Sequence, residues 1–219
     1  MWAVLTERGK RKARWDPEEF LQTGSQEIAS VLSRVRRLGI NVVMNEALDF
    51  GCGAGRLTQG LAKAGFQHVT GIDVASGMIA KAVELNRFGA RCTFVANEVT
   101  NLALLGSSTI DFVYSSRVLQ HMPSSLAHDY IREFFRVARP GACVVFQLPE
   151  RPAPTPKGIA VRLIPDAALT RLRRGMQMHG TKQSDVRTLV TSAGGKVVEA
   201  SQDDAAGPGW ISRLYVCQS

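Results

Sequence analysis

The residues best suited to chemistry lie in the stretch Ala47 to Gly65, which reads ALDFGCGAGRLTQGLAKAG. An apolar run ends in the acid Asp49, and Gly51, Gly53 and Gly55 follow before a helix-compatible run begins. Glycine allows backbone to approach a ligand closely, because it has no Cβ and accepts positive φ. The N-terminus of the helix behind such a loop offers free N–H groups and a partial positive charge. The pattern predicts a nucleotide-binding turn; a tight strand-to-helix turn without a ligand is the alternative.

A second acid stands at the spacing expected of a ribose-binding carboxylate. Residues Val69 to Asp73 read VTGID, a second apolar run, and Asp73 lies 18 residues after Gly55. A carboxylate accepts two hydrogen bonds from a cis-diol, which suits the hydroxyls of a ribose. The alternative is that Asp73 caps the helix predicted over Ala75–Leu85, and the two roles compete.

Strands and helices must alternate to position these residues. Apolar runs indicate further strands, and their alternation with helical segments favours a mostly parallel sheet with helices on both faces. Turn residues Arg139-Pro140-Gly141 precede the fifth strand. The predicted strands after the second are Cys92–Ala96, Ile110–Tyr114, Ala142–Leu148, Lys196–Ser201 and Trp210–Gln218, with helices over Leu57–Ala64 and Lys182–Ala193.

Less regular segments lie on either side of this core. The amphipathic stretch Pro17–Leu38 predicts a helix capped by Asp16, with Thr23-Gly24 as a candidate break into two helices. Prolines at 149, 152, 154 and 156 predict an irregular loop over residues 149–157. Residues 159–180 are ambiguous, being apolar in part and basic in part.

At this point the chain resembles the class I S-adenosylmethionine-dependent methyltransferases, in particular bacterial members that act on small molecules. The resemblance implies an α/β, doubly wound, Rossmann-like sheet of seven strands, mostly parallel, whose last strand runs antiparallel between its neighbours. It also implies a helical cap at the N-terminus. Matching segments in order and spacing are LDFGCGAGRLT (Leu48–Thr58), GIDVASGMIAKA (Gly71–Ala82), IDFVYSSRVLQHM (Ile110–Met122) and REFFRVARPGACVVFQLP (Arg132–Pro149), with a weaker match at WDPEEFLQTGSQEI (Trp15–Ile28).

We expect one methyltransferase domain over residues 1–219, divided into four parts. Residues 1–40 would form the N-terminal cap or lid, and 45–148 the cofactor-binding core. Residues 149–181 would form an insertion on the substrate side, and 182–219 the C-terminal helix and last two strands.

The resemblance implies a cofactor site for S-adenosylmethionine, which leaves as S-adenosylhomocysteine. Asp49 would support the loop and meet the amino group, directly or through water, and Asp73 would bind the ribose hydroxyls. Glu98 follows Asn97 where the family often has Gly-Asp, a departure from the family pattern, and a glutamate there would still accept from the exocyclic amino group of adenine. The implied cofactor-binding residues are Asp49, Gly51, Gly53, Gly55, Asp73, Val74, Met78, Asn97, Glu98, Val99, Ser115 and Arg117.

A hydroxyl acceptor must lose its proton during methyl transfer, and histidine suits that task near neutral pH. His121 lies six residues after Ser115, beside the expected crevice, and His179 lies in the substrate-side insertion. Both are candidate general bases. The other two histidines, His68 and His128, are expected at the surface. Trp15, Phe20, Met176 and His179 are candidate substrate-binding residues, and packing over the cofactor or between subunits is the alternative for each.

Composition excludes some classes of protein. Hydrophobic residues make up 45% and charged residues 21%, which is ordinary for a globular chain. No apolar stretch approaches the roughly 20 residues of a membrane span, and the first residues lack the apolar core of a signal peptide. Cys52, Cys92, Cys143 and Cys217 show neither metal-binding nor disulfide spacing, so buried thiols, no metal and a cytoplasmic location are expected.

The net charge of +8 leaves several partners open. Basic clusters lie at Arg8–Arg14, Arg34–Arg37 and Arg171–Arg174, and solvated helix faces explain them without any partner. Amino methyltransferases that act on adenine or glutamine resemble one another in an Asn/Asp-Pro-Pro-Tyr/Phe motif after the fourth strand, and methylation of cytosine at carbon 5 needs a nucleophilic cysteine near that site. This chain has neither the motif nor a cysteine there. We therefore predict O-methylation of a small molecule, which could be acidic, by a monomer or homodimer. The alternatives are an RNA or protein methyltransferase and a non-catalytic module that binds S-adenosylmethionine.

Overall fold

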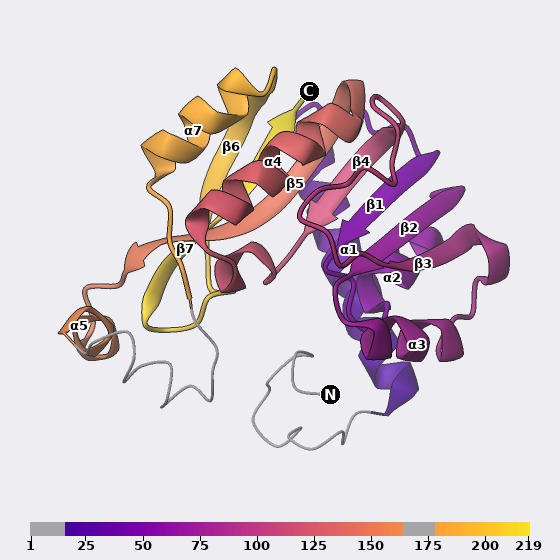
Figure 1. Cartoon of the computed structure of the whole chain (residues 1–219), viewed down its shortest axis with the longest axis horizontal. Coiled ribbons are helices and arrows are strands. Elements are labelled where there is room, and N and C mark those ends of the chain that lie inside the picture. Colours follow the sequence, from indigo (N-terminus) through magenta and orange to yellow (C-terminus); the bar gives the residue numbers. More distant parts are fainter. Residues whose placement is uncertain (1–15, 164–177) are drawn as a thin grey trace. The chain divides into compact units, whose positions relative to one another are not determined.

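The computed structural model describes residues 16–163 and 178–219. Its strands form a seven-stranded sheet in the order β3-β2-β1-β4-β5-β7-β6, in which β7 is antiparallel to both of its neighbours (Figure 1). This order confirms the predicted fold class, a Rossmann-like α/β sheet with an antiparallel last strand. The strands are β1 (Glu46–Phe50), β2 (His68–Asp73), β3 (Cys92–Ala96), β4 (Ile110–Ser115), β5 (Ala138–Pro152), β6 (Lys196–Asp203) and β7 (Trp210–Gln218).

Two compact units make up the chain. Unit 1 comprises the described residues of Met1–Val99 together with Thr109–Tyr114, and unit 2 comprises Thr100–Ser108 and the described residues of Ser115–Ser219. The single-domain organisation expected from the sequence stays a prediction. Helices of unit 1 are α1 (Pro17–Arg37), α2 (Arg56–Ala64) and α3 (Ser76–Glu84), with the short 3₁₀ helix η1 (Gly89–Arg91). Those of unit 2 are η2 (Leu119–His121), α4 (Ser124–Val137), α5 (Pro156–Leu163) and α7 (Gln183–Ser192).

Unit 1 is built on the parallel strands β3, β2, β1 and β4. The apolar faces of these strands supply its core, where the rings of Phe66 and Phe112 lie 5.4 Å apart and Leu48 and Ile72 are almost fully buried. Because the strands are parallel, the residues that follow β1, β2 and β3 emerge at the same edge of the sheet. This edge carries the glycine loop and Asp73.

The helix α1 is continuous, and the break predicted at Thr23-Gly24 is wrong. Asp16 caps it as expected, accepting hydrogen bonds from the backbone N–H groups of Glu18 (2.9 Å) and Glu19 (3.1 Å). Gly24 serves helix packing instead, because a Cβ at this position would lie 2.1 Å from the carbonyl oxygen of Arg56. The backbones of α1 and α2 therefore meet without an intervening side chain at Gly24.

Unit 2 contains the antiparallel strands β5, β7 and β6, with α4 packed on β5 and on α7, and α7 packed on β6. Its core includes the stacked rings of Phe146 and Tyr215, 5.1 Å apart, and the buried side chains of Ile131 and Phe134. Phe146 and Tyr215 belong to the apolar runs from which the sequence predicts the strands Ala142–Leu148 and Trp210–Gln218.

Strand β5 is longer than predicted at both ends. The expected turn at Arg139-Pro140-Gly141 lies inside the strand, where Gly141 has φ +82° and its N–H donates to the carbonyl oxygen of Ser219. The expected loop over 149–157 is also partly wrong, because β5 continues to Pro152 and α5 begins at Pro156. Proline fits a bulge in a strand or the first turn of a helix, and Thr155 Oγ1 accepts from the N–H of Gly158.

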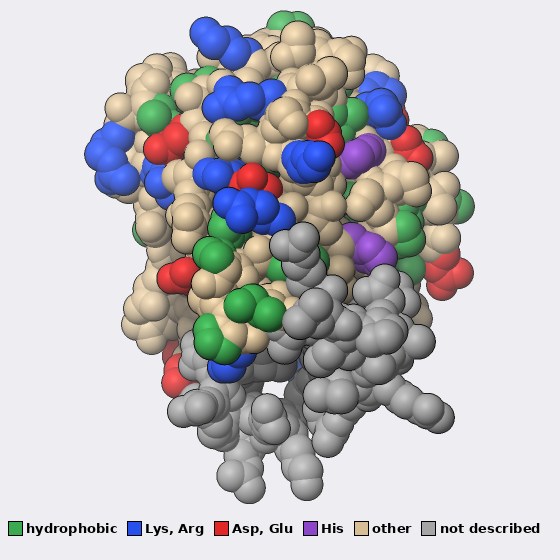
Figure 2. Space-filling model, turned by 90° about the vertical axis from the view of Figure 1, so that its left-hand side faces the viewer, with side chains coloured by type: hydrophobic (Ala, Val, Ile, Leu, Met, Phe, Trp, Pro, Cys, Tyr) green, Lys and Arg blue, Asp and Glu red, His purple; other side chains and the backbone are tan. Residues whose placement is uncertain are grey.

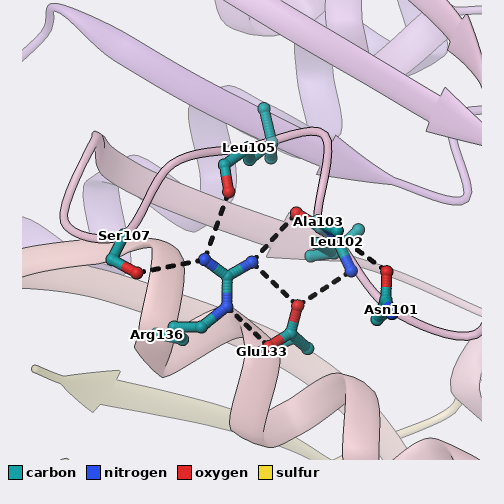
Figure 3. A network of polar contacts seen from close by, with 7 residues as sticks. All are labelled: Asn101, Leu102, Ala103, Leu105, Ser107, Glu133 and Arg136. Carbon is teal, nitrogen blue, oxygen red and sulfur yellow. Dashed lines mark hydrogen bonds and ion pairs between the residues drawn. The ribbon is translucent and has the colours of Figure 1, made fainter.

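One ion pair fastens the segment that follows β3 onto α4 (Figure 3). The guanidinium of Arg136 donates to the carbonyl oxygens of Leu102 (2.9 Å) and Leu105 (3.1 Å) and to both carboxylate oxygens of Glu133. Glu133 also accepts from the N–H of Leu102 at 2.8 Å, and hydrogen bonding to Arg136 lowers the pKa of this carboxyl. The side chains of Arg136 and Glu133 thus provide hydrogen-bond partners for backbone groups of Leu102 and Leu105, which lie in an irregular segment.

We expect Arg136→Ala to lower the free energy of unfolding by about 1–3 kcal/mol, since it removes the donor from two part-buried carbonyl bonds and leaves Glu133 with the N–H of Leu102. The matched control is Arg132→Ala on the same helix, which removes an exposed ion pair with Asp129. Its effect should stay within about 0.5 kcal/mol. Urea unfolding of both variants measures the difference, and equal losses would contradict the prediction.

Candidate functional site

The glycine loop connects β1 to α2 and is fixed against the end of β2. Gly51, Gly53 and Gly55 have φ values of +77°, +54° and +81°, as the sequence pattern predicts. The N–H groups of Gly51 and Cys52 both donate to the carbonyl oxygen of Ile72, at 2.7 and 2.9 Å. The loop is therefore preformed by backbone bonds to the neighbouring strand.

The glycines of this loop have different environments. Among the described residues, a Cβ on Gly53 would meet only the terminal methyl of Met78, at 3.6 Å, which leaves space there for a ligand. A Cβ on Gly55 would lie 2.7 Å from the ring of Phe94. Gly55 is required by packing within unit 1 as well as by its positive φ, whatever its part in binding.

Asp73 ties the loop to the turn after β2. One carboxylate oxygen, Oδ2, accepts from the N–H of Gly53 at 2.8 Å, and Oδ1 accepts from the N–H of Ala75 at 2.9 Å. The alternative role as the cap of the following helix does not apply, since the N-cap of α3 is Ala75. Each carboxylate oxygen has a second lone pair, so the half-buried Asp73 can still accept hydrogen bonds from a diol.

Asp49 is fully buried at the end of β1 and is only partly satisfied. Its Oδ2 accepts from the hydroxyl of Thr58 at 2.7 Å, whereas Oδ1 has no hydrogen-bond partner among the described residues. Burial raises the pKa of this carboxyl to about 7, against the lowering effects of Thr58 and Arg56. An unpartnered oxygen on a buried acid is costly unless a ligand completes it.

Apolar and amide groups surround the same edge of the sheet. Val74 follows β2 and Val99 follows the end of β3, with 67% and 56% of their surfaces exposed. Asn97 is buried; its N–H donates to the carbonyl oxygen of Asp73 and its side-chain amide to that of Val99. Glu98 is exposed. Large exposed apolar side chains at adjacent strand ends are what a planar base would cover.

Phe20, a candidate substrate-binding residue, packs inside unit 1. It belongs to a buried cluster with Leu21 and Ala54, against which the half-buried Met78 also packs. Phe20 thus belongs to the same cluster as the loop residue Ala54, and its part in substrate binding stays a prediction. Trp15 and Met176, the other candidates, lie outside the described residues.

In unit 2, Ser115 and Arg117 follow β4 and differ in exposure. Ser115 is buried, and its hydroxyl oxygen has no hydrogen-bond partner in the described ranges. Arg117 is exposed and has φ +62°, an unusual value for a residue with a Cβ. Its N–H donates to the side-chain oxygen of the buried Gln147 at 3.1 Å, which holds this conformation in place.

The two candidate bases lie on neighbouring segments of unit 2. The N–H of His179 donates to the carbonyl oxygen of Gln120 at 2.9 Å, and the Nε2 atoms of Gln120 and His121 are 3.0 Å apart. Gln120 Oε1 accepts from Gln147, so its Nε2 is the donor and His121 Nε2 the acceptor. His179 Nε2 is buried and has no partner within the described part of the chain.

Gln120, Gln147 and Ser212 form a buried polar network that sequence reasoning missed. Gln147 Nε2 donates to Ser212 Oγ at 2.5 Å and to Gln120 Oε1 at 3.3 Å. The available signal is a glutamine inside the apolar run ACVVFQLP, since an unpaired amide is costly in a buried strand.

The remaining titratable groups of the described residues include the four cysteines and two further histidines. All four cysteines are buried and free, as expected, and burial raises the pKa of each thiol, that of Cys92 to about 11. His68 is exposed and lies 3.2 Å from Glu46, but His128 is half-buried and contacts Thr181, which corrects its expected exposure. Residues 16–163 and 178–219 contain no cluster of three potential metal ligands.

Comparison with known proteins gives the class of the chain. Residues 47–141 match the family model described as a methyltransferase domain. A ubiquinone biosynthesis O-methyltransferase of Bordetella avium is 28% identical over 188 residues, covering 82% of this chain and 74% of that protein. One of Vibrio parahaemolyticus is 29% identical over 124 residues, covering 52% of each.

Among solved structures, the magnesium protoporphyrin IX methyltransferase of Synechocystis PCC 6803, with bound S-adenosylhomocysteine, has the same fold. Its TM-score is 0.64 at 22% identity, and the match covers 96% of this chain and 91% of that one. Together with the preformed glycine loop, these matches define a class I methyltransferase fold. Residues 47–141 of the chain form a methyltransferase domain, and the fold is that of the S-adenosylmethionine-dependent class I methyltransferases.

The buried carboxyl of Asp49 should make stability depend on pH. In the folded chain it keeps its proton up to about pH 7, whereas its usual pKa is 3.8. A raised pKa stabilises the folded state below the unfolded value, and this contribution is lost as pH rises towards 7. The loss amounts to at most about 1.4 kcal/mol per pH unit.

Asp49→Asn should therefore flatten the fall in the free energy of unfolding between about pH 4 and 7. Urea unfolding of the ligand-free protein across this range provides the measurement. Parallel curves for the parent and the variant would show that Asp49 titrates elsewhere.

Proposed function

We propose that this methyltransferase transfers the methyl group of S-adenosylmethionine to an oxygen atom of a small molecule. Relatives named as ubiquinone biosynthesis O-methyltransferases support the acceptor atom at low identity. The observation that carries the cofactor assignment is the unpartnered, fully buried Oδ1 of Asp49, beside a preformed glycine loop. A cationic amino group is the complement of that oxygen.

The residues of unit 1 fit the cofactor along its length. Asp49 would hold the amino group, with Gly51 and Gly53 against the methionine and ribose portion. Asp73 would accept hydrogen bonds from the ribose hydroxyls. Adenine would lie against Val74 and Val99, with Asn97 and Glu98 at its edge and Met78 behind; Gly55 would support the loop through packing.

When bound, S-adenosylmethionine would supply an electrophilic methyl group on its sulfonium sulfur, and transfer of that methyl to the acceptor oxygen would release S-adenosylhomocysteine. The protein's own part is to position the acceptor and to remove its proton, and alignment of reactants alone contributes roughly 7–11 kcal/mol to such reactions. His179 is the stronger candidate base, because its Nε2 has no partner among the described residues while His121 Nε2 accepts from Gln120. Ser115 and Arg117 would contact the acceptor.

No observation favours a macromolecular substrate over a small one. Two of the basic clusters, Arg8–Arg14 and Arg171–Arg174, lie outside the described residues. Figure 2 shows Lys and Arg side chains spread over one face, with Asp and Glu side chains among them. Within the described ranges, no helix has the length and apolar character needed to span a membrane.

Asp73→Ala should weaken binding of S-adenosylhomocysteine about 10- to 100-fold, the usual effect of removing hydrogen bonds to a charged group. Isothermal titration with S-adenosylhomocysteine and with its 2′-deoxy analogue separates ribose contact from loop support. The parent should prefer the hydroxylated ligand, and the variant should bind both equally. If the variant kept the parent's preference, the ribose assignment would be wrong.

His179→Ala should lower kcat about 10²- to 10⁴-fold on a phenolic or other hydroxyl substrate, the range typical of a lost general base. His121→Ala is the matched control and should retain more activity, because its Nε2 is engaged by Gln120. Turnover of a panel of hydroxylated aromatic compounds and sugars, followed across pH, provides the measurement. Near-parental rates in both variants would reject a histidine base.

A further inference from the structure

The helix α1 brings a carboxylate to the first residue of α2. Arg56 follows the glycine loop directly, and only 9% of its side chain is exposed. Its Nη1 donates to Glu27 Oε2 at 2.8 Å, and the hydroxyl of Tyr114, at the end of β4, donates to Glu27 Oε1 at 2.9 Å. One carboxylate thus connects α1, α2 and β4 within unit 1.

A buried guanidinium at this place requires a carboxylate partner. Arg56 stays charged at any ordinary pH, and a positive charge at a helix N-terminus is unfavourable to the helix dipole. Leaving such a charge unpaired in the interior is strongly destabilising. Glu27 is the partner in this structure, and the charge of Arg56 also acts on the carboxyl of Asp49, whose pKa it lowers.

The close packing of α1 on α2 fixes the position of Glu27. Gly24 lies three residues before it, against the carbonyl of Arg56, and a Cβ on Gly60 of α2 would lie 2.8 Å from the carbonyl oxygen of Gly24. The two glycines let the helix backbones approach closely. Glu27 is therefore held beside Arg56 by backbone packing and not only by its own ion pair.

The charges around Asp49 act in opposite directions. Arg56 on α2 lowers the pKa of the Asp49 carboxyl, and Glu27 on α1 raises it. Other titratable groups near Asp49 are the phenol of Tyr114, its partner in the sheet register, and the thiols of Cys52 and Cys92. Burial raises the pKa of both thiols, so they are neutral near pH 7. Arg56 and Glu27 are therefore the charged groups through which α2 and α1 act on the Asp49 carboxyl.

We propose that Glu27 is a positioning residue of the cofactor site: by binding Arg56, it prevents the guanidinium from pairing with Asp49 and leaves Asp49 Oδ1 for the cofactor's amino group. The inference rests on the proposed contact between Asp49 and that group. Arg56 and the cofactor's ammonium would otherwise compete for one buried carboxylate. The N-terminal helix thereby sets the affinity of the cofactor site through the ion pair of Glu27 with Arg56.

The test compares Glu27→Gln, Arg56→Gln and the double variant by isothermal titration with S-adenosylhomocysteine between pH 6 and 8. In Glu27→Gln the freed guanidinium should capture Asp49 and weaken binding about tenfold or more at pH 8. The pH dependence of ligand binding by Glu27→Gln should move to lower pH. Arg56→Gln should bind within about threefold of the parent at pH 8, with its pH dependence moved upward, and the double variant should return close to the parent.

A second measurement uses the ligand-free protein, where carbon-13 NMR follows the titration of the Asp49 carboxyl, assigned with Asp49→Asn. Its pKa should fall in Glu27→Gln and rise in Arg56→Gln. The matched control is Glu18→Gln, which removes the surface ion pair with Arg87 from the same helix and should leave both measurements unchanged.

Two different failures can be told apart. If Asp49→Asn bound S-adenosylhomocysteine as tightly as the parent, the contact to the amino group would be wrong. If Asp49→Asn weakened binding while the double variant stayed as weak as Glu27→Gln, the ion pair would have only a structural role. Pairing of Arg56 with Asp49 would then be rejected. Should Glu27→Gln not fold, the upward shift expected in Arg56→Gln still decides the matter.

Discussion

The candidate cofactor site depends on the two backbone hydrogen bonds that the carboxylate of Asp73 accepts. One comes from Gly53 in the loop after β1 and the other from Ala75 in the turn after β2, so a single side chain joins two segments that are distant in sequence. The carbonyl of Ile72 adds bonds from Gly51 and Cys52. A loop held in this way needs little reorganisation when a ligand arrives, which reduces the entropic cost of binding.

The charged groups around this loop leave one carboxylate oxygen of a buried acid without a hydrogen-bond donor among the described residues. Within the part of the chain that the structure describes, Asp49 has a hydroxyl donor on one oxygen and none on the other, while the nearby arginine is paired with Glu27. An apolar replacement for Asp49 would be better for stability alone, because burying an unsatisfied carboxyl is unfavourable. The arrangement is typical of a site in which stability is reduced in favour of ligand binding.

Much of the fold could be predicted because its signals are local. Apolar runs ending in Asp49 and Asp73, and glycines at positive φ, identify the loop and the parallel strands without any tertiary information. The errors arose where proline and glycine fit more than one context. Gly24 reads as a helix break but serves a helix crossing, and Pro156 reads as loop but begins α5. The network around Gln147 could not be predicted, since its partners are distant in sequence.

The contact at Gly24 affects how variants of this chain should be interpreted. A side chain there would displace α2, and with it the loop residues that directly precede that helix. Substitution at a glycine buried between two helices could therefore abolish cofactor binding as fully as substitution in the loop. In a mutational scan scored by activity, position 24 would be indistinguishable from a ligand contact. In this fold, a position can be sensitive to mutation because it packs against the helix that follows the loop, as well as because it lies near the ligand.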